Sequence, residues 1–115
     1  PRGFSPRVLP MLLLSTTETI TGREVAAHVG VVSGNTVRAK HLGRDIAAGL
    51  KTLIGGEVGG YTEMLAESRN QAIERMIQAA QELGADAIIG VRFTTSAVAQ
   101  GMSEMLAFGT AVKLA

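Results

Sequence analysis

The hydrophobic pattern of the chain changes its period twice, from strand-like to helical near His41 and back to strand-like after Gly84. Before His41, residues 11–16 and 25–32 form apolar, strand-compatible runs, and we expect each to form a strand. The second run alternates little, which is typical of a strand covered on both faces. Residues 33–36, Ser-Gly-Asn-Thr, have the composition of a turn and should end this strand.

Two helices are predicted between the strand regions. Apolar side chains recur at helical spacing over residues 42–54, which predicts a first helix ended by a Gly-Gly pair. A second helix is predicted over residues 60–83, with Gly84 in the position that commonly follows a helix C-terminus. At about 1.5 Å per residue it would be roughly 35 Å long, enough to cross a small sheet. Its apolar stripe consists of Tyr61, Leu65, Ser68, Ala72, Met76, Ala79 and Leu83.

After Gly84 a period of two returns, and it predicts a hairpin. Residues 87–98 and 102–114 should form its strands, joined by a turn at Gln100-Gly101. Alternation places Ile89 and Val91 on the same face of the first strand. On the last strand, small residues share one face and would let a helix or another subunit approach closely. These are Ala107, Gly109 and Ala111.

The order of these elements predicts an α+β fold: an antiparallel sheet with two helices packed on one face, in the order β-β-α-α-β-β. The other face of the sheet would be partly open in a monomer. A chain of 115 residues is long enough for one domain. Residues 1–10 differ in composition from the rest, so we interpret them as a vector-derived tag, with Met11 as the natural start of a single domain over residues 11–115.

Charged residues are scarce in this chain. They make up 18% of it, against about 25% in a typical soluble domain, and the mean hydropathy is +0.25. Because a small domain has a large surface to cover, this composition predicts that part of the surface is buried against copies of the same chain. The alternative is a monomer whose surface is covered by Ala, Gly, Ser and Thr.

The charge balance and the lack of cysteine narrow the classes of partner. A formal net charge of +1 gives no argument for binding nucleic acid or an anionic membrane. No apolar run approaches the ~20 residues of a membrane-spanning helix. The absence of cysteine excludes disulfides and thiolate chemistry, and it fits a cytoplasmic location.

The glycine-rich stretch over residues 55–60, Gly-Gly-Glu-Val-Gly-Gly, has two interpretations. Backbone N–H groups of such a turn at a helix N-terminus can bind an anion. However, the stretch matches neither the dinucleotide-binding nor the Walker pattern, and Glu57 would repel a phosphate. The sequence therefore favours a tight turn between two helices, with Glu57 near the positive end of the helix dipole.

Arg69 lies beside the apolar stripe of the second predicted helix. A guanidinium in that position either extends toward solvent or meets a carboxylate, and the candidates are Glu57 and Glu104. A bidentate pair would hold the glycine-rich stretch in place. Any pocket in the protein should be lined by this pair.

Oxygen and nitrogen ligands for a divalent metal ion form a second candidate set. Its members are His28, His41, Asp45, Glu57 and Glu63. His41 and Asp45 would share a helical face because they are four residues apart. No His-x-x-x-His or EF-hand spacing is present, and solvated surface charges explain the same residues equally well. No catalytic residue is expected, because the chain lacks a Gly-x-Ser-x-Gly motif and has only two histidines to act as bases.

Several longer motifs resemble the YbjQ-like family, described as heavy-metal-binding, over Met11 to Leu114. The motifs are Ser15-Thr-Thr, Ile54-Gly-Gly-Glu-Val-x-x-Tyr-Thr62, Ser68-Arg-x-x-Ala-x-x-Arg-Met76, Gly84-Ala-Asp-Ala-Ile-Ile-Gly-Val-Arg-Phe93 and Phe108-Gly-Thr-Ala-Val112. The resemblance implies a dodecin-subunit-like α+β plan and assembly into rings of five. It also implies a site at Glu57, Tyr61 and Arg69. The absence of cysteine argues against soft-metal binding at such a site.

Two functional hypotheses follow, with a third of lower weight. In the first, the protein is a homo-oligomer, favoured as a pentamer, that binds a small ligand or a divalent metal between subunits around Glu57 and Arg69. In the second, it is an interaction scaffold without a ligand. The third is hydrolysis in a pocket between subunits, for which His28 and His41 are the only possible bases and which activity screening of His28→Ala would test.

Overall fold

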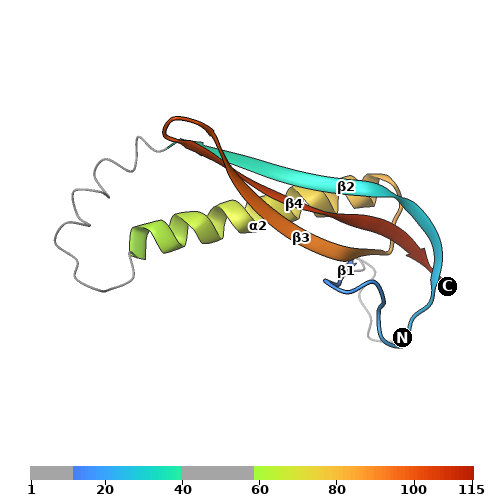
Figure 1. Ribbon diagram of the computed structural model, residues 1–115. Coiled ribbons are helices and arrows are strands. Elements are labelled where there is room, and N and C mark those ends of the chain that lie inside the picture. Colours follow the sequence, from blue (N-terminus) through green and yellow to red (C-terminus); the bar gives the residue numbers. More distant parts are fainter. Residues whose placement is uncertain (1–11, 40–58) are drawn as a thin grey trace, which may run out of the picture.

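The computed structural model describes residues 12–39 and 59–115, which form one sheet and one helix (Figure 1). The elements in chain order are β1 (Leu13–Leu14), β2 (Val25–Ala39), α2 (Gly59–Glu82), β3 (Ala87–Ala99) and β4 (Met102–Leu114). The strand order in the sheet is β1-β3-β4-β2. Figure 1 shows α2 lying along one face of this sheet.

The expected fold class was wrong in its sheet and in its helices. β1 runs parallel to β3, with Leu13 opposite Ala87, so the sheet is mixed rather than antiparallel. Within the described residues the order is β-β-α-β-β, with one helix on the sheet where two were expected. The helix predicted over residues 42–54 lies outside the described residues. A pairing of only two residues is too short for a hydrophobic period to reveal its direction.

The second predicted helix and the hairpin are confirmed. α2 runs from Gly59 to Glu82, one residue earlier at each end than predicted. β3 and β4 pair antiparallel around a turn that includes Gly101, whose φ is 77°. These elements have long, regular patterns and clear end signals, which is why the sequence identifies them.

β2 is a single strand of 15 residues, so the turn predicted over residues 33–36 was wrong. Those residues continue the antiparallel ladder with β4, from Ser33 opposite Phe108 to Thr36 opposite Met105. The composition of this segment is typical of a turn only when it is considered locally. Pairing with the full length of β4 overrides that local preference.

The main hydrophobic core lies between α2 and the sheet. On the helix, Ala72, Met76 and Ala80 are fully buried. They pack against a set of buried sheet residues, which are Val32, Ile88, Val91, Ala107 and Ala111. The prediction that small residues of β4 admit a close neighbour is confirmed at Ala107 and Ala111, and the neighbour is α2.

Gly34 is the point at which α2 comes closest to β2. A Cβ atom at this position would overlap the carbonyl oxygen of Ala72 and the amide nitrogen of Met76, and would lie 2.8 Å from Cβ of Arg75. Backbone atoms of a helix cannot move aside as a side-chain end can. Only glycine therefore allows the helix to sit at this distance from the strand.

A bulge in β3 changes which residues face the helix. The pairing between β3 and β4 shifts between Ile89 and Arg92, and Gly90 has a φ of 62°, as in bulges that place glycine in the left-handed region. As a result Val91 joins the core under α2, whereas Ile89 packs on the opposite face. The prediction that these two residues share a face was wrong, because one inserted residue reverses the alternation.

The sheet face opposite α2 is covered at one end, within the described residues. Ala87, Ile89 and Val112 form a small buried cluster there, over which Ile20, Val25 and Leu114 pack. Further along β2, Val31 is 80% exposed and Val37 is 47% exposed. The expectation that residues 25–32 are covered on both faces was therefore wrong for the described part of the chain.

The Gly34 contact predicts a large effect for a single methyl group. Gly34→Ala should lower the free energy of unfolding by about 1–3 kcal/mol, because the helix must move off the strand. For a domain of this size that corresponds to a fall in Tm of roughly 4–8 °C per kcal/mol. The control is Gly30→Ala, whose new Cβ would meet only Cδ1 of Leu83 at 3.6 Å. Equal melting temperatures for the two variants would contradict the proposed contact.

Candidate functional site

A cavity of about 460 Å³ lies between the first half of α2 and the distal ends of β2, β3 and β4. Its basic side chains are Arg38 and Arg69, and its hydroxyl-bearing lining residues are Thr36, Ser68, Thr95, Ser96 and Ser103. Its apolar wall consists of Met64, Leu65, Ala97 and Met105. This size is within the range of small-molecule sites, roughly 300–1,000 Å³.

The cavity exists because α2 and the sheet separate toward the N-terminal end of the helix (Figure 1). The β2 residues that face α2 become larger in this direction, from Gly34 to Thr36 to Arg38. Helix and strand are in backbone contact at Gly34. At Thr36, Oγ1 donates to the carbonyl oxygen of Ser68 over 3.2 Å. At Arg38 a complete guanidinium side chain fits between helix and sheet.

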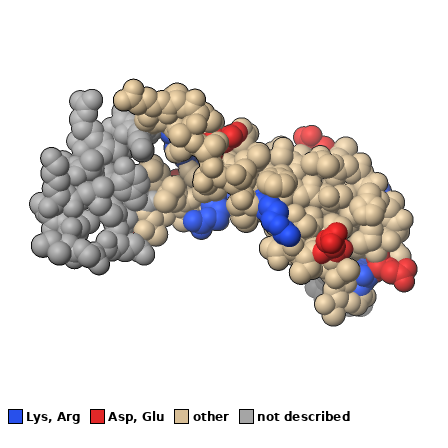
Figure 2. Space-filling model, in the orientation of Figure 1, with Lys and Arg blue, Asp and Glu red and all other residues tan. Residues whose placement is uncertain are grey.

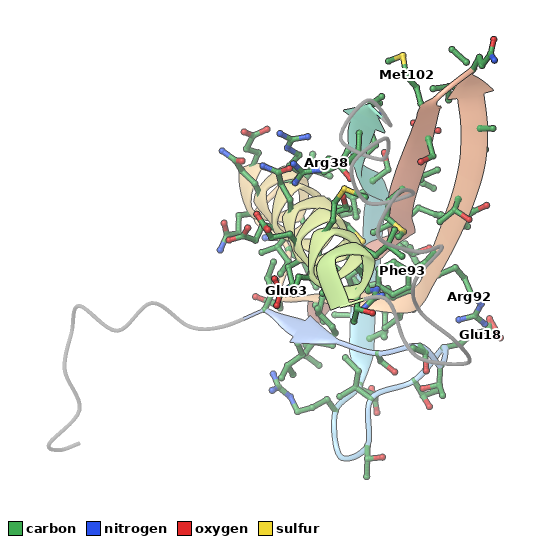
Figure 3. All side chains as sticks on the ribbon, turned by 90° about the vertical axis from the view of Figure 1, so that its left-hand side faces the viewer. Glu18, Arg38, Glu63, Arg92, Phe93 and Met102 are labelled. Atoms are coloured by element: carbon green, nitrogen blue, oxygen red, sulfur yellow. The ribbon has the colours of Figure 1, made fainter. Side chains whose placement is uncertain are left out.

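Arg38 is half-buried and is held by two side chains of α2. Its Nε donates to Oγ of Ser68 over 2.9 Å, and its Nη2 donates to Oε1 of Gln71 over 3.2 Å. Figure 3 shows Arg38 between β2 and the helix. Both partners are neutral, and no carboxylate of the described residues forms an ion pair with this guanidinium. A half-buried positive charge thus lacks a counter-ion within the described part of the chain.

Arg69 lines the same cavity from α2, next to Ser68, and its side chain is exposed. The prediction placed this residue against Glu57 or Glu104. Glu57 lies outside the described residues. Glu104 does not pair with Arg69 in the described structure, because its Oε2 accepts a hydrogen bond of 2.9 Å from Nδ2 of Asn35.

Glu104 contributes to the cavity rim without facing the helix. It alternates along β4 with Ser103 and Met105, and Met105 packs against the core under α2. Glu104 therefore points to the opposite face of the sheet, as Asn35 does. Among the described residues that line the cavity, the charged side chains between α2 and the sheet are those of Arg38, on β2, and Arg69, on α2.

The other residues of the predicted ligand and metal sets remain predictions. His41, Asp45 and Glu57 lie outside the described residues, as does the side chain of Tyr61, which belongs to the first turn of α2. His28 is exposed on β2, opposite Val112.

His28 and the cavity lie at opposite ends of β2. Ten residues separate His28 from Arg38, which is on the order of 30 Å of extended strand. Glu63, another member of the predicted metal set, is exposed on α2. No three His, Asp or Glu side chains come together as a metal site in the part of the chain that the structure describes.

Sequence reasoning identified Arg69 but missed Arg38. The reason is the predicted turn at residues 33–36, which ended β2 before it reached Arg38. Had the strand been continued with a period of two from Gly34, Thr36 and Arg38 would have been assigned to the helix-facing side. Ser68 lies on the predicted apolar stripe of the helix. A serine among apolar residues indicates a polar partner on the sheet, and that partner is Arg38.

The comparisons with known proteins agree on one family. A family model described as "Putative heavy-metal-binding" matches residues 12–115. The UPF0145 protein of Vibrio campbellii is 62% identical over 103 residues, which cover 90% of this chain and 99% of that protein. The UPF0145 protein of Archaeoglobus fulgidus is 58% identical over 103 residues, which cover 90% of this chain and 95% of that protein.

A solved structure supports the fold. It is the crystal structure of a protein of unknown function from Pediococcus pentosaceus that belongs to the DUF74 family. The TM-score is 0.60 at 18% identity, and the match covers 90% of this chain and 98% of the other. At this identity the likeness concerns the fold alone.

The hydrogen bond between Arg38 and Ser68 predicts a measurable stability effect. Ser68 is 2% exposed, and Ser68→Ala leaves Nε of Arg38 without its acceptor. The free energy of unfolding, measured in urea, should fall by about 1–3 kcal/mol. Ser103→Ala is the control, since this exposed residue lines the cavity without a hydrogen bond of its side chain to the described residues. Its effect should stay within about 0.5 kcal/mol, and equal losses in both variants would contradict the role of Ser68.

Proposed function

Because the chain belongs to the YbjQ-like family, we propose that it is a homo-oligomeric protein that binds a small ligand in the cavity beside α2. The observation that carries this proposal is the half-buried guanidinium of Arg38, held by Ser68 and Gln71 at the cavity wall. A positive charge in that position is costly unless a partner compensates it. A ligand that enters the cavity would be such a partner. We propose binding without catalysis.

A divalent metal ion is the second candidate ligand, and the family description favours it. Its proposed ligands are His28, His41, Asp45 and Glu57, of which only His28 belongs to the described residues. The soft donors at the cavity are the thioethers of Met64 and Met105. The two arginines beside them oppose a cation. We therefore place the small ligand first.

Self-association is the second part of the proposal. The outer edge of β2 has no partner strand among the described residues. The edge of β3 that faces away from β4 is also unpaired among the described residues beyond Val91, where its hydrogen bonds to the segment that includes Ser15 end. Unpaired strand edges of this length are places at which another chain can add a strand.

These two edges differ from one another, so pairing edge to edge would be a head-to-tail contact of the kind that closes into a ring. A ring of five is what the family resemblance implies. The exposed Val31 and Val37 belong to the edge strand β2, so in such an assembly their side chains would lie beside those of the strand added by the neighbouring subunit. Charged side chains are few and scattered on the face drawn in Figure 2, which suits a surface that meets other subunits.

The cellular location remains a proposal. The described residues contain no helix that is both long enough and apolar enough to span a membrane. A cytoplasmic location is proposed on the absence of cysteine from the chain.

The assembly is tested by light scattering on the purified protein. A pentamer should have five times the mass of the 12.0 kDa chain. Val31→Lys places a charge on the open face at a position that is already 80% exposed in the single chain, so it should release monomers without unfolding them. Gln78→Lys on the exposed side of α2 is the control and should leave the mass unchanged. A wild-type mass of 12.0 kDa would contradict the proposal.

The binding function is tested by a thermal-shift screen of small organic acids, neutral organic compounds and divalent metal salts. At least one compound should raise the Tm of the wild type. Ser103→Trp fills the cavity and should abolish that rise, whereas Gln78→Trp, which lies away from the cavity, should retain it. A screen in which no compound raises the Tm would favour the scaffold hypothesis instead.

A further inference from the structure

We infer that the ligand of the cavity is a small organic anion: a carboxylate attached to a short apolar chain. The inference rests on the proposed binding function and goes beyond it by assigning the chemical class of the ligand. It depends on the hydrogen-bond geometry of Arg38, on the distribution of charge around the cavity, and on the apolar side chains that line it.

Only one edge of the Arg38 guanidinium donates hydrogen bonds within the described residues. A guanidinium has five N–H donors in a rigid planar arrangement. The edge formed by Nε and Nη2 is directed at α2, where Ser68 and Gln71 accept its hydrogen bonds. The other edge, formed by Nη1 and the second hydrogen of Nη2, has no acceptor among the described residues. Two parallel N–H donors of this kind match the two oxygens of a carboxylate.

Arg38 is already in place before a ligand binds. Its side chain is anchored at two points on the helix, and Ser68 is itself held against β2, because its carbonyl oxygen accepts from Thr36 Oγ1. A rotamer that is fixed in advance loses little entropy when the ligand arrives. An arginine that served only to solvate the surface would not need this support.

The charged side chains at the cavity favour an anionic ligand. Arg69, which follows Ser68 on α2, adds a second guanidinium to the cavity, and the one carboxylate among the described lining residues is that of Glu104. Glu104 is turned to the opposite face and is bound by Asn35. Two like charges at one cavity attract an anion and repel a metal cation.

The apolar lining of the cavity limits the size and polarity of the anion. Met64, Leu65, Ala97 and Met105 line the cavity, and Leu65 is 44% exposed. A compact anion such as inorganic phosphate would leave this wall in contact with water. A carboxylate with an apolar chain would cover the wall while its head group meets Arg38. Methionine side chains adapt to apolar groups of various shapes, which suits such a wall.

Isothermal titration calorimetry with three probes tests this assignment. Octanoate carries the inferred head group and chain, 1-octanol carries the chain without the charge, and inorganic phosphate carries the charge without the chain. The wild-type protein should bind octanoate at least about tenfold more tightly than either of the others. Affinity for octanoate should fall as the salt concentration rises.

Charge-removing variants identify the residue responsible. Arg38→Gln should weaken octanoate binding by about tenfold or more, and Arg69→Gln by a smaller factor, about two- to fivefold. Arg23→Gln removes the same charge from an exposed turn away from the cavity and should have no effect. Because Arg69 is exposed, its replacement tests the charge argument even if Arg38→Gln disturbs folding.

The outcomes separate this inference from the function on which it rests. Equal binding of octanoate and 1-octanol, or tighter binding of phosphate or of a divalent metal ion at this cavity, would overturn the anion assignment and leave a binding protein. Octanoate binding that is unchanged in both arginine variants would also overturn it. If none of the probes binds and the thermal-shift screen finds no ligand, the binding function falls as well.

Discussion

The backbone contact between α2 and β2 at Gly34 is the constraint on which the other features of the structure depend. It fixes the helix against the strand at one point, where a single Cβ atom would overlap helix backbone. On one side of this point, alanines and Met76 pack tightly against the sheet. On the other side, Thr36 and Arg38 hold the helix progressively further away. The core and the cavity are therefore two consequences of one contact.

The same arrangement explains why Arg38 can remain half-buried. The increase in side-chain size along β2 leaves room for a guanidinium, and α2 supplies two neutral acceptors in place of a carboxylate. These two acceptors satisfy the N–H donors on one edge of the guanidinium. The positive charge of Arg38 has no counter-ion within the described residues. If Arg38 formed an ion pair with a carboxylate of the protein, its charge would already be compensated and it would bind an anionic ligand only weakly. Because its partners are neutral, its charge is still available to a ligand.

The sequence predicted the parts of the fold whose signals are long and local. α2 has a helical stripe and a glycine after its end, and the hairpin of β3 and β4 has a period of two around a glycine turn. The continuation of β2 through residues 33–36 could not be predicted, because pairing with β4 decides it against the local composition. The parallel contact of β1 is two residues long and gives no pattern at all. The candidate site was predicted in part for the same reason. Arg69 lies on a helix that the sequence predicts correctly. Arg38 lies beyond residues 33–36, where a turn was predicted and the structure has a continuous strand.

The proposed ligand site is the free edge of the Arg38 guanidinium, which would bind a carboxylate in the cavity. The most direct measurement is a two-dimensional NMR titration of ¹⁵N-labelled protein with octanoate that follows the side-chain Nε–H signal of Arg38 and the backbone amide signals of Ser68 and Ser103. We expect these three signals to shift together and reach saturation, while the amide signal of His28 at the far end of β2 does not move. Signals that stay unchanged at the cavity, or that shift only elsewhere in the protein, would contradict it.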